Sequence, residues 1–431
     1  MKIYQGIPKT IGVLLLLFIM VFANIQIATI PATAADTTST IIGRAYQDIN
    51  RNKIFNVGDS ALPGWTVVLT NTSGVVGSVT TNVSGYFLFK NLAPGQYILT
   101  EVVQQGYVNT TPRFSTITVT AGKTLDYTSL AGGFGNRPIA AYVVNSRSNT
   151  VSVINTATNK IMATLLVGYG LYGVATTPDG TRAYVTVLNS NAISVIDTTT
   201  NRVVAKVIVG YGLYSVGITP DGKRAYATNI NGHTVSVINT ATNTVIATIP
   251  VGLGPRGIDF TPDGTRAFVG NTGGNTVSVI NTATNTVIAT IPVGKNPRDV
   301  AITPDGKRAY VTNIYSNTVS VINTATNTVI ATIPAGINPH GIEINPGGTR
   351  AYVANYGSGT VSVINTATNT VIATIPVGTG PYDVMFTPDG TRLYLTNDLY
   401  AGTVRVIDTA TNTVIGSPIR VGMYPLTLAI A

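Results

Sequence analysis

The sequence of 431 residues contains no cysteine and only two histidines, His233 and His340. Without cysteine, disulfides, iron–sulfur clusters, thiolate metal sites and cysteine nucleophiles are all excluded. Two histidines nearly exclude a multi-histidine metal centre as well. Charged residues amount to 10% of the chain, against about a quarter in typical soluble proteins. This composition argues against a helical bundle, a coiled coil or a disordered tail.

Turn formers and β-branched residues are abundant instead. The chain has 44 glycines and 22 prolines, with many Thr, Asn, Val and Ile, and 44% of its residues are apolar. Such a composition predicts an all-β protein with a sizeable core. The formal charge of +9 is spread along the chain rather than gathered in one stripe, so we expect no nucleic-acid partner.

Residues 1–35 are predicted to be a secretory signal peptide. Lys2 and Lys9 precede the 13-residue apolar run Ile11–Ala23, and the A-x-A site Ala32–Ala34 follows it. An uncleaved anchor is the alternative, but 13 residues are short for a span that needs about 20. No later run is as long and apolar, so we expect a secreted protein without a transmembrane segment after cleavage.

The rest of the chain is dominated by a repeat. Five consecutive units of 42 residues fill residues 181–390, with an irregular first copy at 137–180 and a last copy at 391–431. Each unit has four short apolar runs separated by turn signals such as Thr-Pro-Asp-Gly. No gap leaves room for a crossover helix, so neighbouring strands are antiparallel. Four strands in about 40–45 residues is the period of a β-propeller blade, which predicts seven blades over 137–431.

The order of the runs at the two ends predicts a closed ring. The first copy opens with Ala140–Asn145, which matches the second strand of a blade, and the chain finishes with Leu426–Ala431, a first strand. The C-terminal strand is therefore expected to complete the first blade and leave no free edge. An open solenoid is the alternative, but it requires polar caps, and none is visible.

The repeats resemble a known family. The runs RAYVTN and TVSVINTATNTVIATIPVG and the turn TPDG are similar to the YVTN-type β-propeller repeats of archaeal and bacterial surface proteins, with Tyr310–Asn313 as the tetrad itself. The resemblance covers 137–431 and implies the propeller fold. It implies little about function, because propellers serve many functions.

Residues 36–135 follow a different pattern, in which alternating apolar positions flank Gly and Pro-Gly turns. The pattern predicts a small antiparallel β-sandwich. The segments AYQDINRNKIFNVGDSALPGWTVVL and GYFLFKNLAPGQYILTE resemble the prealbumin-like SdrD B-like domains of bacterial surface adhesins. Relatives of such domains sometimes form a Lys–Asn isopeptide bond beside a glutamate. Glu101 is present, but the first strand has Arg44 and no lysine, so we expect no crosslink.

The loop Asp48–Asp59 has the spacing of a calcium-binding loop, with oxygen-bearing side chains at positions 1, 3, 5, 9 and 12 and a backbone carbonyl expected at position 7. The predicted calcium ligands are Asp48, Asn50, Asn52, Ile54 and Asp59. Lys53 stands where glycine is usual, and Asp59 stands where a bidentate glutamate is usual. A polar Asx-turn loop without metal is the alternative.

Three N-x-[ST] sequons, at Asn71, Asn82 and Asn109, lie in the same domain. Glycosylation there would mark exposed loops, and chance occurrence in a Thr- and Ser-rich stretch is the alternative.

The copies diverge on one face of the predicted propeller. The TPDG and NTATN turns are near-identical, whereas the connections after the second and fourth strands vary, and strand alternation places these on the opposite face. One variable column is expected to ring the mouth of the central channel: Tyr172, Tyr214, Arg256, Arg298, His340, Tyr382 and Leu426. Aromatic faces beside two arginines suit an anionic or glycan ligand. Packing that merely fills the channel mouth is the alternative.

Other residues of the variable face are expected close to this column: Asp299 and Asp383 beside it, and Arg147, His233, Tyr315, Tyr356 and Tyr400 in the second loop. The arginine that follows each turn before the second strand is interpreted as structural, either snorkelling or paired with the turn aspartate.

Catalysis is the weaker interpretation of this face. The propeller class is also similar to lactonases and to cofactor-bearing dehydrogenases, and His340 with Asp299 and Asp383 is the conceivable set for metal-dependent hydrolysis. We expect no enzyme but a secreted, surface-layer-associated protein. Its propeller is a rigid adhesion platform for an envelope glycan or surface protein, on a calcium-stabilised spacer. An extracellular lactonase-like hydrolase is the alternative.

Overall fold

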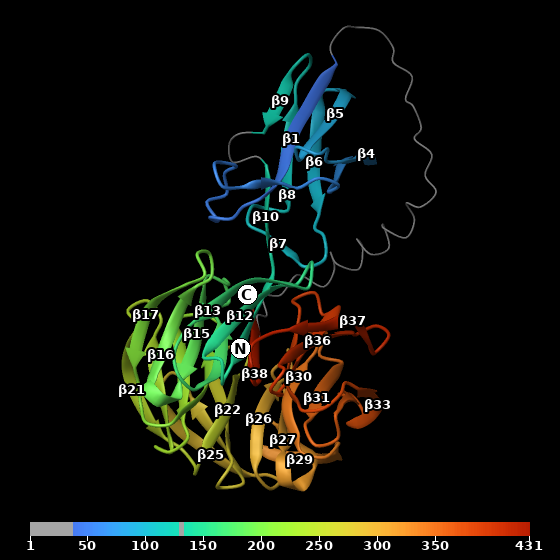
Figure 1. Ribbon diagram of the computed structural model, residues 1–431. Helices are drawn as coiled ribbons and strands as arrows, with labels where there is room; N and C mark the ends of the chain where they lie inside the picture. Colours follow the sequence, from blue (N-terminus) through green and yellow to red (C-terminus); the bar gives the residue numbers. More distant parts are fainter. Residues whose placement is uncertain (1–37, 129–132) are drawn as a thin grey trace. The chain divides into compact units, whose positions relative to one another are not determined.

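The computed structural model describes residues 38–128 and 133–431, which divide into two compact units between Pro138 and Ile139 (Figure 1). The predicted signal peptide at 1–35 lies outside the described residues. Within the part of the chain that the structure describes, no helix has the length and apolar character needed to cross a bilayer. The predicted fold class, a β-sandwich followed by a β-propeller, is confirmed.

The first unit consists of two sheets. Its strands are β1 (Ser39–Gln47), β2 (Ser60–Ala61), β3 (Thr66–Asn71), β4 (Gly74–Thr80), β5 (Tyr86–Leu92), β6 (Gly95–Val102), β7 (Tyr107–Asn109), β8 (Phe114–Val119), β9 (Thr124–Tyr127) and β10 (Phe134–Pro138). One sheet has the order β4-β3-β6-β8, and the other is built around β1, which pairs with β2, β5, β9 and β10.

The pairing around β1 corrects one expectation. The sequence predicts a small antiparallel sandwich, but β1 pairs in parallel with both β9 and β10. Parallel pairing requires a long crossover connection, and β9 and β10 reach β1 only after the chain has built the second sheet. The alternating apolar positions predicted from the sequence do form the core, in which Trp65, Phe87 and Leu99 are almost completely buried.

The second unit contains seven four-stranded sheets within the described residues 139–431. Blade 1 contains β38 (Pro425–Ile430), β11 (Ala140–Asn145), β12 (Thr150–Asn155) and β13 (Lys160–Leu166); blade 2 contains β14 (Leu171–Thr176), β15 (Arg182–Val187), β16 (Ala192–Asp197) and β17 (Arg202–Ile208); blade 3 contains β18 (Leu213–Ile218), β19 (Arg224–Asn229), β20 (Thr234–Asn239) and β21 (Thr244–Pro250); blade 4 contains β22 (Pro255–Phe260), β23 (Arg266–Asn271), β24 (Thr276–Asn281) and β25 (Thr286–Pro292).

Blades 5 to 7 continue the same order. Blade 5 contains β26 (Pro297–Ile302), β27 (Arg308–Asn313), β28 (Thr318–Asn323) and β29 (Thr328–Pro334); blade 6 contains β30 (Pro339–Ile344), β31 (Arg350–Asn355), β32 (Thr360–Asn365) and β33 (Thr370–Pro376); blade 7 contains β34 (Pro381–Phe386), β35 (Arg392–Asn397), β36 (Thr403–Asp408) and β37 (Thr413–Arg420). Two 3₁₀ turns, η2 (Leu188–Ser190) and η3 (Ile314–Ser316), lie between second and third strands.

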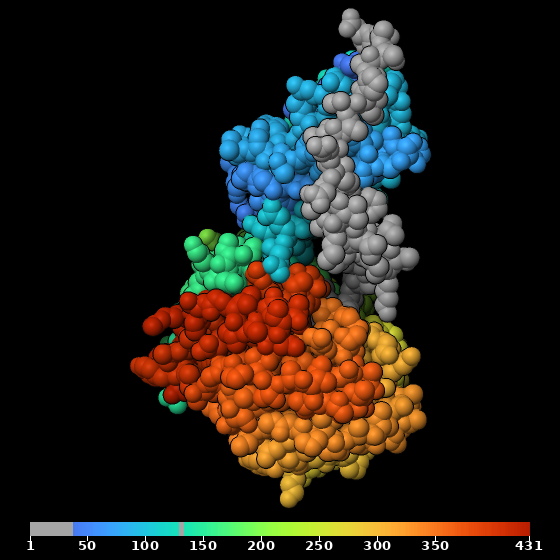
Figure 2. Space-filling view, turned by 90° about the vertical axis from the view of Figure 1, so that its right-hand side faces the viewer, coloured from blue at the N-terminus to red at the C-terminus, as the bar shows by residue number. Residues whose placement is uncertain are grey.

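The innermost strand of each blade packs against the innermost strands of its two neighbours, in the order β38, β14, β18, β22, β26, β30, β34 and back to β38. Figure 1 shows β38 between the green first blades and the red last blade, and Figure 2 shows the red, orange and yellow blades as one continuous surface. Strand β38 pairs antiparallel with β11. The ring is therefore held shut by main-chain hydrogen bonds between the two ends of the propeller.

The YVTN tetrad explains why neighbouring blades adhere. In blade 5, the Tyr310 hydroxyl donates to Asn369 Oδ1 of the next blade at 2.7 Å, and the Thr312 hydroxyl donates to the His340 carbonyl of the next innermost strand at 2.7 Å. Val311 is fully buried in the core between the blades. Asn313 donates to Ser320 Oγ in its own blade at 2.9 Å. The tetrad thus combines hydrogen bonds between blades, made by Tyr310 and Thr312, with hydrogen bonds within a blade, made by Asn313.

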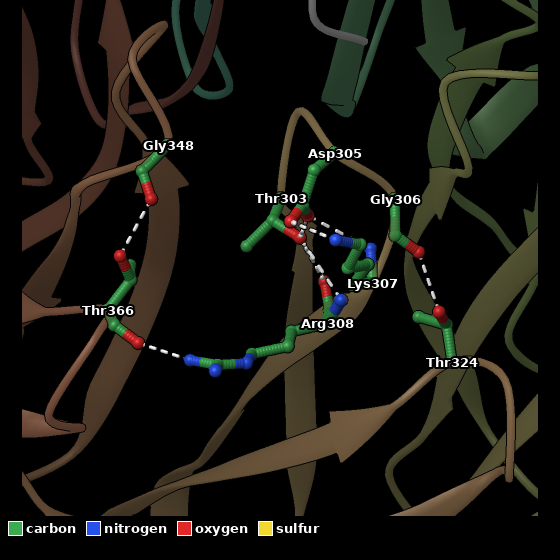
Figure 3. Close-up of polar contacts among 8 residues, drawn as sticks. All are labelled: Thr303, Asp305, Gly306, Lys307, Arg308, Thr324, Gly348 and Thr366. Atoms are coloured by element: carbon green, nitrogen blue, oxygen red, sulfur yellow. Dashed lines mark hydrogen bonds and ion pairs between the residues drawn. The ribbon is translucent and has the colours of Figure 1, made fainter.

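In blades 3 to 7, the side chain of the arginine after the turn donates to a backbone carbonyl of the next blade. In blade 5, Arg308 donates to the carbonyl of Thr366, while Asp305 accepts bonds from Thr303 Oγ1 and the Lys307 amide (Figure 3). The equivalent bond of Arg392 reaches the Thr156 carbonyl at 2.8 Å. Pairing of Arg308 with the turn aspartate is therefore wrong, because its long side chain extends across the blade interface.

Candidate functional site

The six polar or aromatic residues predicted to ring the channel all occupy the second position of an innermost strand. Tyr172, Tyr214, Arg256, Arg298, His340 and Tyr382 come from β14, β18, β22, β26, β30 and β34 respectively; we call these six residues the mouth cluster. Leu426 occupies the equivalent second position of β38, the seventh innermost strand, and is 6% exposed. The variable loops enter these strands directly, so the cluster lies at the variable face.

Two tyrosines meet across the channel. The hydroxyls of Tyr214 in blade 3 and Tyr382 in blade 7 are 3.3 Å apart, and these blades stand on opposite sides of a seven-membered ring. The Tyr172 ring lies 5.1 Å from the Tyr214 ring, centroid to centroid. Side chains therefore span the mouth of the channel, and a ligand on this face meets them first.

The two arginines of the mouth cluster lie against these tyrosines. Arg298 is 5% exposed, donates from Nη2 to the Tyr214 hydroxyl at 3.3 Å, and its guanidinium carbon lies 4.0 Å from the Tyr382 ring centroid. The Arg256 guanidinium carbon lies 5.0 Å from the Tyr214 ring centroid. Aromatic faces stabilise guanidinium groups by cation–π attraction, so the rings accommodate cations that are otherwise expensive to bury.

His340 is held as a neutral side chain. Its ring stacks on Tyr356 at 4.7 Å and meets the edge of Tyr382 at 5.0 Å, both between ring centroids. Burial, followed by the charges of Arg298 and Arg256, lowers the pKa of His340 to about 2. Its Nδ1 atom is buried and has no hydrogen-bond partner.

A cavity of about 80 Å³ lies in the channel, lined by Tyr214, Arg298 and four acidic residues: Asp259, Asp299, Glu343 and Asp383. A water molecule needs roughly 10–15 Å³ of such volume, so several waters fit. The sequence argument found Asp299 and Asp383 but missed Asp259 and Glu343. Asp299 and Asp383 occupy the third position of their innermost strands, whereas Asp259 and Glu343 occupy the fifth. Because side chains alternate with a period of two, all four point to the same side of their strands.

The channel carboxylates bind backbone amides of the next blade. Asp299 Oδ2 accepts from the Ile342 amide at 3.0 Å, and Asp383 Oδ2 accepts from the Leu428 amide at 3.1 Å. Burial, followed by repulsion from Asp299, raises the pKa of Asp383 to about 7. Among the described residues, no three His, Asp or Glu side chains are arranged to hold a metal ion. His340, Asp299 and Asp383 thus do not form the metal-dependent set considered from the sequence.

The second-loop residues have different surroundings. Tyr356 joins the mouth cluster through its stack on His340, whereas His233 Nδ1 accepts from the Gly254 amide at 3.1 Å, and Arg147 lies over the Tyr424 ring at 4.9 Å. Tyr315 and Tyr400 are both 72% exposed. Exposed tyrosines also occupy the loops that enter blades 2 and 3, where Tyr169 and Tyr211 are 73% and 68% exposed. We call Tyr169, Tyr211, Tyr315 and Tyr400 the rim tyrosines.

In the predicted calcium loop of the sandwich, side-chain oxygens accept hydrogen bonds from backbone amides, as in Asx turns. Asp48 is fully buried, and its two carboxylate oxygens accept from the amides of Asn52 and Lys53 at 3.1 and 3.0 Å. Asp59 closes the loop by accepting from the Ile49 amide at 2.9 Å. Lys53 has φ of +65°, the left-handed conformation that explains why glycine is usual at this position. The all-oxygen donor set fits a hard cation such as calcium.

A buried carboxyl in the sandwich links three strands. Glu101 of β6 accepts from Asn136 Nδ2 of β10 at 2.8 Å and from Asn109 Nδ2 of β7 at 2.7 Å. Burial raises the pKa of Glu101 to about 8. The Asn109 amide nitrogen is therefore engaged in the fold, which favours chance occurrence of this sequon over glycosylation. The spacing of Asn109 and Glu101 in the sequence does not reveal this hydrogen bond.

Comparisons with protein-family models agree with both units. Residues 40–124 match the SdrD B-like domain, and residues 260–356 match the YNCE-like beta-propeller. The two resemblances seen in the sequence are thus confirmed. Colossin-B of Dictyostelium discoideum is 35% identical over 71 residues, which is 14% of this chain, and the chain spans only 2% of that protein's length.

Solved structures agree with the propeller fold. A functionally unknown protein from Desulfotomaculum acetoxidans is 22% identical with a TM-score of 0.61, covering 68% of this chain and 98% of its own. Hydrazine synthase of Kuenenia stuttgartiensis is 22% identical with a TM-score of 0.56, covering 60% and 89%. The dihydro-heme d1 dehydrogenase NirN is 15% identical with a TM-score of 0.53, covering 67% and 74%. At these identities the likeness concerns the fold alone.

Proposed function

We propose that this chain is a secreted cell-surface protein, in which the variable face of the propeller is a rigid platform for binding an envelope glycan or surface protein. The observation that carries the proposal is the contrast between faces. The repeats keep near-identical turns on one face, whereas the other gathers two arginines, a neutral histidine and tyrosines that differ from blade to blade. Exposed aromatic residues are characteristic of binding surfaces.

The SdrD B-like match and the Colossin-B likeness support the surface role. The sandwich is proposed to act as a spacer. A binding role is favoured over lactonase-like hydrolysis for two reasons. The buried Nδ1 atom of His340 has no hydrogen-bond partner among the described residues, and the channel carboxylates are bonded to backbone amides.

The test is binding of the full chain to isolated host envelopes. Replacing Tyr169 and Tyr211 together by serine should weaken saturable binding at least 10-fold without changing the melting temperature, because both side chains are exposed. The matched control is Phe114→Ser, which removes a 62% exposed aromatic from the sandwich. Equal binding by both variants and the unmodified chain would place the interaction away from the variable face.

The calcium proposal has its own test. We infer that calcium binds the loop through Asp48, Asn50, Asn52, the Ile54 carbonyl and Asp59. Millimolar Ca²⁺ should raise the melting temperature of the sandwich, as followed by the fluorescence of Trp65, the single tryptophan. The Asp59→Asn variant should lose most of the shift, because a site for Ca²⁺ depends on carboxylate charge. An identical shift in the variant, or none in the unmodified chain, would contradict the site.

A further inference from the structure

We propose that the mouth cluster binds one carboxylate group carried by a saccharide, held between Arg256, Arg298 and His340. The inference rests on the proposed function, because it names the ligand that the variable face would recognise. It requires three features of the structure: positive charge that no direct ion pair neutralises, donor atoms without an acceptor, and ring faces beside them.

The positive charge is the first of these. Among the described residues, neither Arg256 nor Arg298 forms an ion pair, although Arg298 is 5% exposed. Burying a charged group without a partner costs far more free energy than burying a paired one. Cation–π contacts with Tyr214 and Tyr382 recover part of this cost. An anion placed between the two guanidinium groups would recover more.

The unsatisfied donors are the second. Arg256 Nε and His340 Nδ1 are both buried atoms without a hydrogen-bond partner. An arginine Nε always carries hydrogen, and a neutral imidazole carries one N–H that Nδ1 can hold. Buried polar atoms are rarely left without partners in native proteins. A carboxylate, which accepts bonds at two oxygens and matches the planar guanidinium fork, suits both donors.

The nearby acids offset this charge only in part, although Asp299 attracts the Arg298 guanidinium electrostatically. Asp299 and Asp383 accept bonds from the Ile342 and Leu428 amides of the following blades. Asp398 lies in the loop between β35 and β36. The charge of Arg298 is close enough to lower the pKa of Asp398, but the two side chains form no ion pair. Asp398 is half-buried, and burial raises its pKa to about 6.

The ring faces indicate a saccharide rather than a bare anion. Tyr172, Tyr214 and Tyr356 form ring contacts with members of the cluster, and the rim tyrosines are exposed on the same face. Aromatic side chains combine an apolar face with a polar hydroxyl, which suits the C–H face and hydroxyls of a sugar. A uronic-acid residue presents both this face and the carboxylate.

The experiment is titration calorimetry of the full chain with a linear tri-uronide, the neutral trisaccharide of the same linkage, sodium acetate and inorganic phosphate. The tri-uronide should bind with one site per chain, and the neutral sugar at least 10-fold more weakly. Arg256→Gln and His340→Phe should each weaken tri-uronide binding at least 10-fold. Arg256→Lys should weaken it less than Arg256→Gln, because lysine keeps the charge but loses the planar fork.

The matched control is Lys295→Gln, which removes an exposed positive charge from a loop of the same face and should change the affinity less than twofold. Equal effects of Lys295→Gln and Arg256→Gln would reduce the binding to general electrostatics and overturn the proposal. Acetate or phosphate binding as tightly as the tri-uronide would overturn the saccharide part. Envelope binding that depends on the rim tyrosines but persists without any tri-uronide binding would overturn this inference and leave the platform function standing.

Discussion

At the scale of single residues, one missing hydroxyl distinguishes blade 4. Six blades use a tyrosine to donate to an asparagine of the next blade, as Tyr226 does to Asn285 Oδ1 at 2.9 Å. Blade 4 has Phe268 at this place, and Asn327 Oδ1 is left as a buried acceptor without a partner. The Phe268→Tyr variant should therefore stabilise the propeller by about 1 kcal/mol, the usual net value of one hydrogen bond. Urea denaturation followed by far-ultraviolet circular dichroism measures the change.

The reverse substitution is the control. Tyr310→Phe removes the equivalent hydroxyl in blade 5 and leaves Asn369 Oδ1 unsatisfied, so it should destabilise the propeller by a similar amount. A neutral or destabilising Phe268→Tyr would show that the blade 4–5 interface is packed differently from the rest.

Glu101 makes the sandwich sensitive to pH. Burial raises the pKa of its carboxyl to about 8 in the folded chain from the ordinary 4.5. The folded chain thus binds the Glu101 proton more tightly than the unfolded chain does. The protonated Glu101 therefore stabilises the fold fully below about pH 4.5, and this stabilisation is lost as the pH rises toward 8. The melting temperature reported by Trp65 fluorescence should fall between pH 5 and 8, and Glu101→Gln should flatten that decline. An equally steep decline in the variant would assign the pH dependence to another group.

At the scale of elements, close approach of innermost strands requires glycine at Gly257 of β22. A Cβ atom there would lie 2.6 Å from the Arg298 carbonyl and 2.7 Å from Asp299 Oδ1 of β26. Gly257→Ala should therefore push β22 and β26 apart, cost about 1–3 kcal/mol of overpacking strain and displace Arg298. Denaturation and tri-uronide titration measure the two effects.

The matched control for this substitution is Gly347→Ala. The added Cβ would meet no atom closer than 3.7 Å, so stability should change by less than about 0.5 kcal/mol, as for most surface substitutions. Tolerance of Gly257→Ala equal to that of Gly347→Ala would mean that the innermost strands can separate without cost.

At the scale of the whole molecule, ring closure depends on β38. This strand pairs with β11, its Leu428 amide donates to Asp383 of β34, and its Ile430 carbonyl accepts from the Thr176 hydroxyl of β14 at 2.8 Å. Truncation after Gly422 removes all three connections and exposes the edge of β11. Hydrogen exchange should then accelerate first in β11–β13, whereas Thr427→Val, which keeps the strand, should leave that protection in place. Uniform protection in the truncated chain would show that the ring does not need β38.

Much of this architecture follows from the sequence because its causes are local. The 42-residue period, the TPDG and NTATN turns and the alternation of apolar residues fix the strands, their antiparallel order and the number of blades. The variable column is also readable, since the copies can be compared within one chain. Comparing the copies two positions after Asp299 and Asp383, on the same side of the innermost strands, would also have identified Asp259 and Glu343.

What only the tertiary structure decided are contacts between residues far apart in sequence. Arg298 meets Tyr214 from 84 positions away, and Arg308 reaches Thr366 of the next blade rather than its own turn. The parallel strands β9 and β10 and the bond from Asn109 to Glu101 arise in the same way. Turn chemistry and alternation act between neighbouring residues, so sequence encodes them directly. The direction in which a side chain crosses the ring depends on how many blades close it and how closely they pack, which no single repeat specifies.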